Sequence, residues 1–394
     1  MKVLVKLLRF LSYQLVSLET WLRKAKEWKK GDPTKPMTWY KTQVDGAKSS
    51  DGSQFCVYFR KGESKNLMVY LCGGGAAWSQ YTAARPMTLE TVIKQEEGFY
   101  FPNLNFYTDY MLNGILENSN SKNPFDSWNV IYIPYTTGDM HVGNREFTYE
   151  ALDGSKKTLY HNGFANVKLS LELAAPMFPE ADRLLIAGES AGAFGSVALG
   201  DFIASYWPKT TQVAVYADAA QVWSKKWVEV LRDAWNAEES LWNCLSEDGE
   251  LIADWFERLS KRLPNAVLLH SNSIFDEVLS KFQNKLNNDT YSFENNALSS
   301  FNSHLKDAEQ RLTRLKNYSR FVTAIGKTDK ETTPHTDCRY PERFYPKGPE
   351  GASLAEWLAK ACCQPEGMKN PGNVGDEHIK ALFEPQTAPN PVNK

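Results

Sequence analysis

Residues 183–206 read RLLIAGESAGAFGSVALGDFIASY and join a short apolar run, a glycine-flanked serine and a run with helical spacing. The serine, Ser190, is the centre of the G-x-S-x-G pattern GESAG at 188–192. In a strand-turn-helix of this kind the serine adopts a strained backbone conformation that exposes its hydroxyl above the sheet, and the glycines let neighbouring backbone pass closely. The pentapeptide alone is common. Here an apolar strand-like run precedes the pattern and a helical run follows it. The pattern in this context predicts a nucleophilic serine.

Short apolar runs rich in β-branched residues recur along the chain, and each is too short for a helix. They predict buried strands at 55–60, 67–71, 130–134, 184–187, 213–217, 266–269 and 321–325. Helical patterns alternate with them at 167–177, 193–206, 225–263 with breaks, 277–286, 296–317 and 354–363. This alternation predicts an α/β fold in which helices flank a mainly parallel central sheet.

Composition and breakers divide the chain into three parts. Residues 1–31 show apolar residues at near-helical spacing among basic ones, which predicts an amphipathic helical segment. Residues 32–363 form the α/β domain, and 364–394, rich in Pro, Asn and Gly, are expected to be a loosely held tail. Two stretches, 80–127 and 224–263, are longer than a connection between two parallel strands needs to be. We expect them to be helical insertions over the active site.

Charge and cysteine usage exclude several classes of protein. The 394 residues carry 45 Lys and Arg against 47 Asp and Glu, a net charge of −2, which argues against a nucleic-acid partner. The six cysteines show no C-x-x-C spacing, so no metal site is expected.

No clear signal peptide or membrane-spanning run is visible, because Lys6 and Arg9 interrupt the first apolar run. We therefore expect a cytoplasmic protein. Unconventional export and a membrane-surface or partner contact through residues 1–30 stay open, although docking of this helix on its own domain is favoured.

A serine nucleophile requires a histidine base and a carboxylate that orients it. Among the histidines after Ser190, His335 lies in a loop that follows the last apolar run, where a base is expected. The others fall in an apparent strand, a charged helical run and the polar tail (His270, His304 and His378). For the acid, Asp218 and Asp276 each follow a strand at the edge where such sites are built, and spacing alone favours neither.

Backbone N–H groups aimed at the developing oxyanion are also needed. The loop GGGAAW at 73–78 follows a strand and offers them, with the N–H of Ala191 as a second donor. A phosphate-binding role for this loop is disfavoured, because neither G-x-G-x-x-G nor G-K-[ST] is present. Trp78 and Asp139 are candidates for the substrate pocket, although Trp78 suits ordinary packing at least equally well. Asp139 and its neighbour His141 lack a third metal ligand at recognisable spacing.

Taken together, these pieces resemble the pectin acetylesterase family, which includes plant pectin deacetylases and the animal deacylase Notum. The segments that carry the resemblance occur in family order across about residues 50–360: GGGAAW at 73–78, IPYTTGDMHVGN at 133–144, YHNGFANV at 160–167, IAGESAGAFG at 186–195, FDE at 275–277 and PHT at 334–336. The resemblance implies an α/β-hydrolase-like fold and hydrolysis of ester-linked acyl groups. It places the nucleophile on Ser190, the base on His335 and the acid on Asp276, with Asp218 as the fallback. It places the oxyanion donors near Gly74, Gly75 and Ala191.

One departure from the family is informative. Secreted relatives usually carry a cysteine just after the glycine loop, whereas Ala76, Ala77 and Ser79 occupy that stretch here. An intracellular member is not expected to meet polymeric pectin, so the family's substrate name transfers poorly.

We therefore expect a serine carboxylester hydrolase that removes a small acyl group, most simply acetyl, from an alcohol or sugar ester without a cofactor. The partner would be a small-molecule or glycan ester. The alternative is a catalytically silent binding protein of the same fold whose N-terminal helix docks on a membrane or partner. Sequence does not separate esters from amides or thioesters, because these share the same nucleophile and oxyanion requirements.

Overall fold

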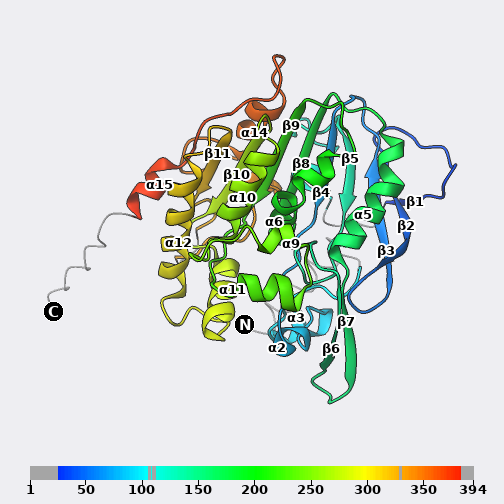
Figure 1. The fold of residues 1–394 in the computed structure, drawn as a ribbon. Coiled ribbons are helices and arrows are strands. Elements are labelled where there is room, and N and C mark those ends of the chain that lie inside the picture. Colours follow the sequence, from blue (N-terminus) through cyan, green and yellow to red (C-terminus); the bar gives the residue numbers. More distant parts are fainter. Residues whose placement is uncertain (1–24, 105–107, 109–111, 328–330, 383–394) are drawn as a thin grey trace, which may run out of the picture.

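The computed structural model describes residues 25–382 apart from 105–107, 109–111 and 328–330 (Figure 1). A nine-stranded sheet lies at its centre, with the strand order β1-β2-β3-β5-β4-β8-β9-β10-β11. The strands are β1 (Lys26–Glu27), β2 (Trp39–Lys48), β3 (Gln54–Arg60), β4 (Leu67–Leu71), β5 (Asn129–Ile133), β8 (Arg183–Glu189), β9 (Gln212–Asp218), β10 (Val267–Ser273) and β11 (Tyr318–Thr323). From β5 to β11 all neighbours are parallel, whereas β3 runs antiparallel to both β2 and β5. The predicted α/β fold with a mainly parallel sheet is confirmed.

The central strands are apolar because both of their faces are covered. Every residue of β4 is buried, as is every residue of β8 after Arg183. Figure 1 shows α5 (Gly163–Ala174), α6 (Ala191–Ala198), α10 (Leu251–Arg262) and α12 (Ala297–Leu312) packed in front of the sheet. On the last strand, Trp357 of α14 (Leu354–Cys362) packs against Phe321, with ring centroids 5.6 Å apart. The apolar runs were readable in the sequence because burial on two faces leaves little room for polar residues.

Strands with exposed faces were not predicted. The hairpin of β6 (Arg145–Glu150) and β7 (Lys156–His161) forms a separate two-stranded sheet, and the residues of β6 are all exposed or half-buried. Strand β2 also carries mostly polar residues after its first two positions. Such segments lack the apolar run that marked the buried strands.

Both ends of the described chain differ from expectation. Residues 1–24 of the predicted amphipathic segment lie outside the described residues. The following residues form strand β1 rather than helix, and Trp28 packs edge-on against Phe59 at 5.2 Å between ring centroids. The predicted loose tail is held as far as residue 382, because Val374 bridges to β11 and Asp376 of α15 (Asp376–Ala381) pairs with Arg320 at 2.8 Å. Such backbone pairing cannot be predicted from amino-acid composition.

Both long insertions contain short helices. Residues 80–127 contain α2 (Gln80–Ala83), α3 (Leu89–Lys94) and the short helix η1 (Gly114–Leu116). Residues 224–263 contain α8 (Trp227–Glu229), η3 (Val230–Ala234), α9 (Glu239–Trp242) and α10. Among the described helices, none combines the length and the apolar character that spanning a bilayer requires.

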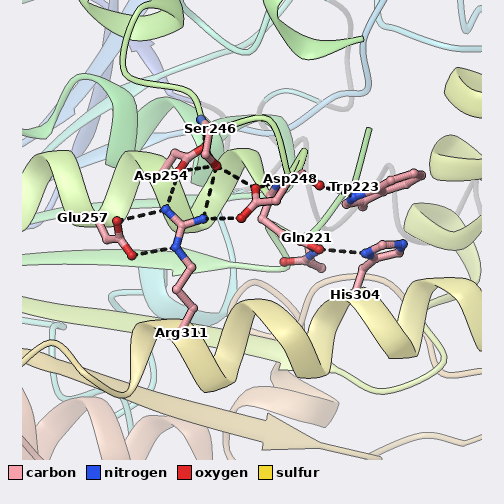
Figure 2. A network of polar contacts seen from close by, with 9 residues as sticks. Gln221, Trp223, Ser246, Asp248, Asp254, Glu257, His304 and Arg311 are labelled. Atoms are coloured by element: carbon pink, nitrogen blue, oxygen red, sulfur yellow. Dashed lines mark hydrogen bonds and ion pairs between the residues drawn. The ribbon is translucent and has the colours of Figure 1, made fainter. Parts of the chain in front are cut away.

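Two side chains of α12 bind the second insertion: His304 lies 2.7 Å from a carboxylate oxygen of Glu250, and Arg311 contacts several further acids (Figure 2). The Arg311 guanidinium is 3.0 Å from a carboxylate oxygen of Asp248, donates to both oxygens of Glu257 at 2.6 and 2.9 Å, and also contacts Asp254. The side chain of Asp254 is only 3% exposed, so the arginine neutralises a charge that water cannot reach.

We expect Arg311→Gln to lower the free energy of unfolding by about 2–3 kcal/mol, because the Asp254 carboxylate would remain buried without its cation. Urea denaturation measures this effect. Arg232→Gln is the matched control, since Arg232 and its partner Asp233 are both about half exposed, at 52%. That exposed ion pair should contribute little to the free energy of unfolding. Equal losses in the two variants would contradict the role given to Arg311.

Candidate active site

Ser190 lies at the sharp turn between β8 and α6. Its φ of 51° and ψ of −125° are strained for a residue with a Cβ, and its N–H donates to the carbonyl of Asp218 at 2.8 Å. The flanking glycines are required by close backbone contact. A Cβ on Gly188 would lie 2.2 Å from the carbonyl oxygen of Gly192, and one on Gly192 would lie 2.0 Å from that of Leu71. This is the backbone of a nucleophile elbow.

His335 is paired with Asp276. Its Nδ1 lies 2.8 Å from Oδ2 of Asp276, which is 1% exposed and is the N-cap of α11 (Glu277–Asn288). The other carboxylate oxygen accepts from the N–H groups of Val278 and Leu279 at 2.9 and 2.8 Å. The helix start therefore fixes the carboxylate, and the carboxylate fixes the imidazole. Nε2 of His335 has no hydrogen-bond partner among the described residues, and His335 lines the same cavity as Ser190.

Asp218 has a different set of partners. One of its oxygens accepts from the Ser271 hydroxyl at 2.6 Å, and the other accepts from the N–H groups of Asp337 and Cys338 at 2.7 and 2.8 Å. Asp218 thus anchors the loop that follows His335. The structure pairs Asp276 with the imidazole, a choice that spacing in the sequence left open.

The glycine loop lies beside the elbow. Gly75 has a φ of 80°, and a Cβ there would lie 1.9 Å from the carbonyl oxygen of Phe99. None of the hydrogen bonds found among the described residues uses the backbone N–H of Gly74, Gly75 or Ala191, and all three residues line the cavity. The N–H of Ala76 donates to Phe99 at 2.7 Å and is therefore engaged elsewhere.

The cavity over these groups measures about 710 Å³ and is mostly apolar. Much of its apolar wall comes from the first insertion and from α11, through Met87, Phe101, Val278, Leu279, Phe282 and the following Tyr291. No residue of 224–263 lines it, so the expectation that this insertion covers the site is wrong. That stretch packs beside α6 and α12 instead.

Neither of the two candidate pocket residues lines the cavity. Trp78 packs against Phe99 and Phe282 at 6.0 and 5.9 Å between ring centroids and does not line the cavity. Asp139 does not line it either, since it accepts from the Thr137 hydroxyl at 2.6 Å and from the Gly163 N–H at 2.8 Å. Burial raises the pKa of Asp139 to about 6. Its role in the structure is to hold its own loop against the start of α5.

A charged pair that was not predicted lies directly under the site. Arg339, which lines the cavity, is 3.0 Å from a carboxylate oxygen of Glu189, the residue before the nucleophile. The G-x-S-x-G pattern leaves this position free, so the pattern held no signal for a buried acid there.

The described residues contain no group of three or more His, Cys, Asp or Glu side chains that could hold a metal ion. All six cysteines are described and are free thiols.

The chain is similar to known proteins over about half of its length. The chain is 28% identical to pectin acetylesterase 11 of Arabidopsis thaliana over 189 residues and 27% identical to pectin acetylesterase 7 of the same plant over 190 residues. Each match covers 47% of this chain and 45% of the relative, so the chain matches less than half the length of either. The family model described as Pectinacetylesterase matches residues 29–232, which contain the glycine loop and Ser190 but not Asp276 or His335. Because that match spans more than half of the sequence, the chain belongs to the pectin acetylesterase family.

Proposed function

We propose that the protein is a serine carboxylester hydrolase that removes a small acyl group, most simply acetyl, from an alcohol or sugar ester. The observation that carries the proposal is the His335–Asp276 pair, which leaves Nε2 of the imidazole unpartnered in the cavity that Ser190 also lines. Membership of the family supports hydrolysis of an acyl ester.

The proposed reaction uses these groups in the following order. Nε2 of His335 accepts the Ser190 proton as Oγ bonds to the ester carbonyl carbon, and Asp276 holds the Nδ1–H and stabilises the imidazolium. The N–H groups of Gly74, Gly75 and Ala191 are the donors for the oxyanion. The C–O bond to the alcohol then breaks, and His335 returns the proton to the leaving alkoxide. Water attacks the acyl-enzyme by the same route and releases the acid and free Ser190.

The chemistry of the cavity favours an uncharged alcohol over an acidic polymer. Most of the wall is apolar, and its two arginines are each paired with an acid. Arg339 lies 3.0 Å from Glu189, and Arg343 lies 3.0 Å from Asp337. A polyuronide would have to compete with these carboxylates for its cations.

Hydrolysis of p-nitrophenyl esters from acetate to octanoate, together with labelling by a fluorophosphonate probe, tests the proposal. We expect turnover of acetate and stoichiometric labelling. If folded wild-type protein cleaves no ester and takes up no probe, the proposal falls and the catalytically silent binding protein replaces it.

The pH dependence of this hydrolysis is a further prediction. Burial lowers the pKa of His335, but the charge and hydrogen bond of Asp276 outweigh it, with smaller contributions from Asp218 and Glu189, so the pKa lies above the ordinary 6.5. Only the neutral imidazole can accept the serine proton, so kcat/KM should rise with pH through that raised pKa. We expect the acidic limb of the kcat/KM profile for p-nitrophenyl acetate to have its midpoint above pH 6.5. A midpoint at or below that value would contradict this electrostatic account of the site.

A further inference from the structure

Glu189 is a buried acid placed immediately before the nucleophile. It is 1% exposed, and its carboxylate is surrounded by donors. The Tyr70 hydroxyl donates to Oε2 at 2.6 Å, the Gly73 N–H donates to Oε1 at 3.3 Å, and Nη1 of Arg339 lies 3.0 Å from the same Oε1. A buried carboxylate remains ionised only when such partners replace water.

Two of these donors, Gly73 and Arg339, come from segments that carry reacting groups. Gly73 begins the glycine loop after β4, Glu189 itself leads into the elbow, and Arg339 lies four residues after the base, His335. One carboxylate is therefore bonded to the oxyanion loop and to the His335 loop while it is covalently joined to the nucleophile. The backbone fits closely here, since a Cβ on Gly73 would lie 2.6 Å from the carbonyl oxygen of Glu189.

The charge of Glu189 would oppose catalysis if it stood alone. The oxyanion forms at the N–H groups of Gly74, Gly75 and Ala191, which are sequence neighbours of Gly73 and Ser190. A negative charge at this depth repels a second one strongly, because little water screens them. The guanidinium of Arg339 lies on the oxygen that faces the glycine loop, where it cancels this repulsion.

We propose that Glu189 and Arg339 form a charge-balanced positioning pair, in which Glu189 ties the oxyanion loop to the nucleophile and Arg339 neutralises that acid while holding the His335 loop. This inference rests on the proposed ester hydrolysis. It predicts an asymmetry, because removing the cation leaves an uncompensated negative charge beside the oxyanion, whereas removing the acid leaves an unpaired cation, which does not repel the oxyanion.

The rate test is a double-mutant cycle on p-nitrophenyl acetate. We expect Arg339→Gln to lower kcat about 100-fold and Glu189→Gln about 10-fold, while the double variant returns to about the level of Glu189→Gln alone. Arg339→Lys should retain most of the rate, since it keeps the charge. The loss should appear in kcat rather than in KM, because the oxyanion exists only in the transition state.

A second readout does not depend on turnover. His335 is surrounded by the acidic groups Asp276, Asp218 and Glu189, all of which raise its pKa. The pKa of His335, followed by NMR with His335→Gln as the assignment control, should fall in Glu189→Gln and rise in Arg339→Gln. A residue with only a structural role would lower stability without moving this pKa in opposite directions.

Arg343→Gln is the matched control, because it breaks the Arg343–Asp337 pair in the same cavity wall without touching Glu189. The loss of kcat in Arg343→Gln should not be relieved by adding Glu189→Gln. Thermal unfolding of each variant shows whether it is folded. Losses from Glu189→Gln and Arg339→Gln that multiply in the double variant, with the His335 pKa unmoved, would overturn the pair. A wild type that cleaves no ester and binds no probe would overturn the proposed function instead, and the NMR titration would still decide whether the two charges are coupled to His335.

Discussion

Replacing Ser190 with alanine is expected to lower kcat for p-nitrophenyl acetate by about 10⁴-fold or more, because the acyl-enzyme can no longer form. Any residual rate would come from the oxyanion donors and from binding alone. The elbow should survive the change, since its strained backbone is held by the Ser190 N–H bond to the Asp218 carbonyl and by the flanking glycines, all of which alanine leaves in place. Initial rates at saturating ester measure the effect.

The matched control for this substitution is Ser205→Ala. Ser205 follows α7 (Gly200–Ala204), and its hydroxyl donates to the carbonyl of Phe202 at 2.6 Å at an exposed position. This variant should keep the wild-type rate. A folded Ser190→Ala protein that retained more than about a tenth of the activity would show that the chemistry takes place elsewhere.

Asp276→Asn is expected to lower kcat by about 10³–10⁴-fold, the second largest effect, because an amide next to Nδ1 favours the wrong tautomer of the imidazole. The N-cap of α11 can be kept, since asparagine also accepts hydrogen bonds from helix N–H groups. Comparison with Asp218→Asn separates the two acids. Asp218 accepts from the N–H groups of Asp337 and Cys338, so its variant should lose stability more than it loses kcat.

Both variants would be measured for kcat and for the midpoint of urea unfolding. A larger loss of kcat in Asp218→Asn than in Asp276→Asn, at unchanged stability, would reverse the assignment of the acid.

Much of the fold was readable from the sequence because burial on two faces produces apolar runs. This held for β4, β5 and β8, whose central residues are buried. It failed for the β6–β7 hairpin and for the held segment up to residue 382, where single apolar residues such as Leu159 and Ile379 are buried without a continuous apolar run. A search for apolar runs does not detect such scattered contacts.

The candidate site, like the fold, was only partly predictable from the sequence. Ser190 was marked by glycines whose absence of a Cβ the backbone requires, and His335 was marked by its place after the last strand. The choice between Asp218 and Asp276 depended on which carboxylate meets the imidazole, a contact across 59 residues. The Glu189–Arg339 pair joins two positions that no sequence pattern links, so it could be recognised only in the three-dimensional structure.

The central claim is that Ser190 is an activated nucleophile, and the most direct measurement is the mass of peptides from fluorophosphonate-treated protein. We expect one phosphonyl group per chain, carried by the peptide that contains Ser190, with labelling slowed in His335→Ala and absent in Ser190→Ala. Phosphonylation of a different residue, or none at all in folded wild-type protein, would contradict the account.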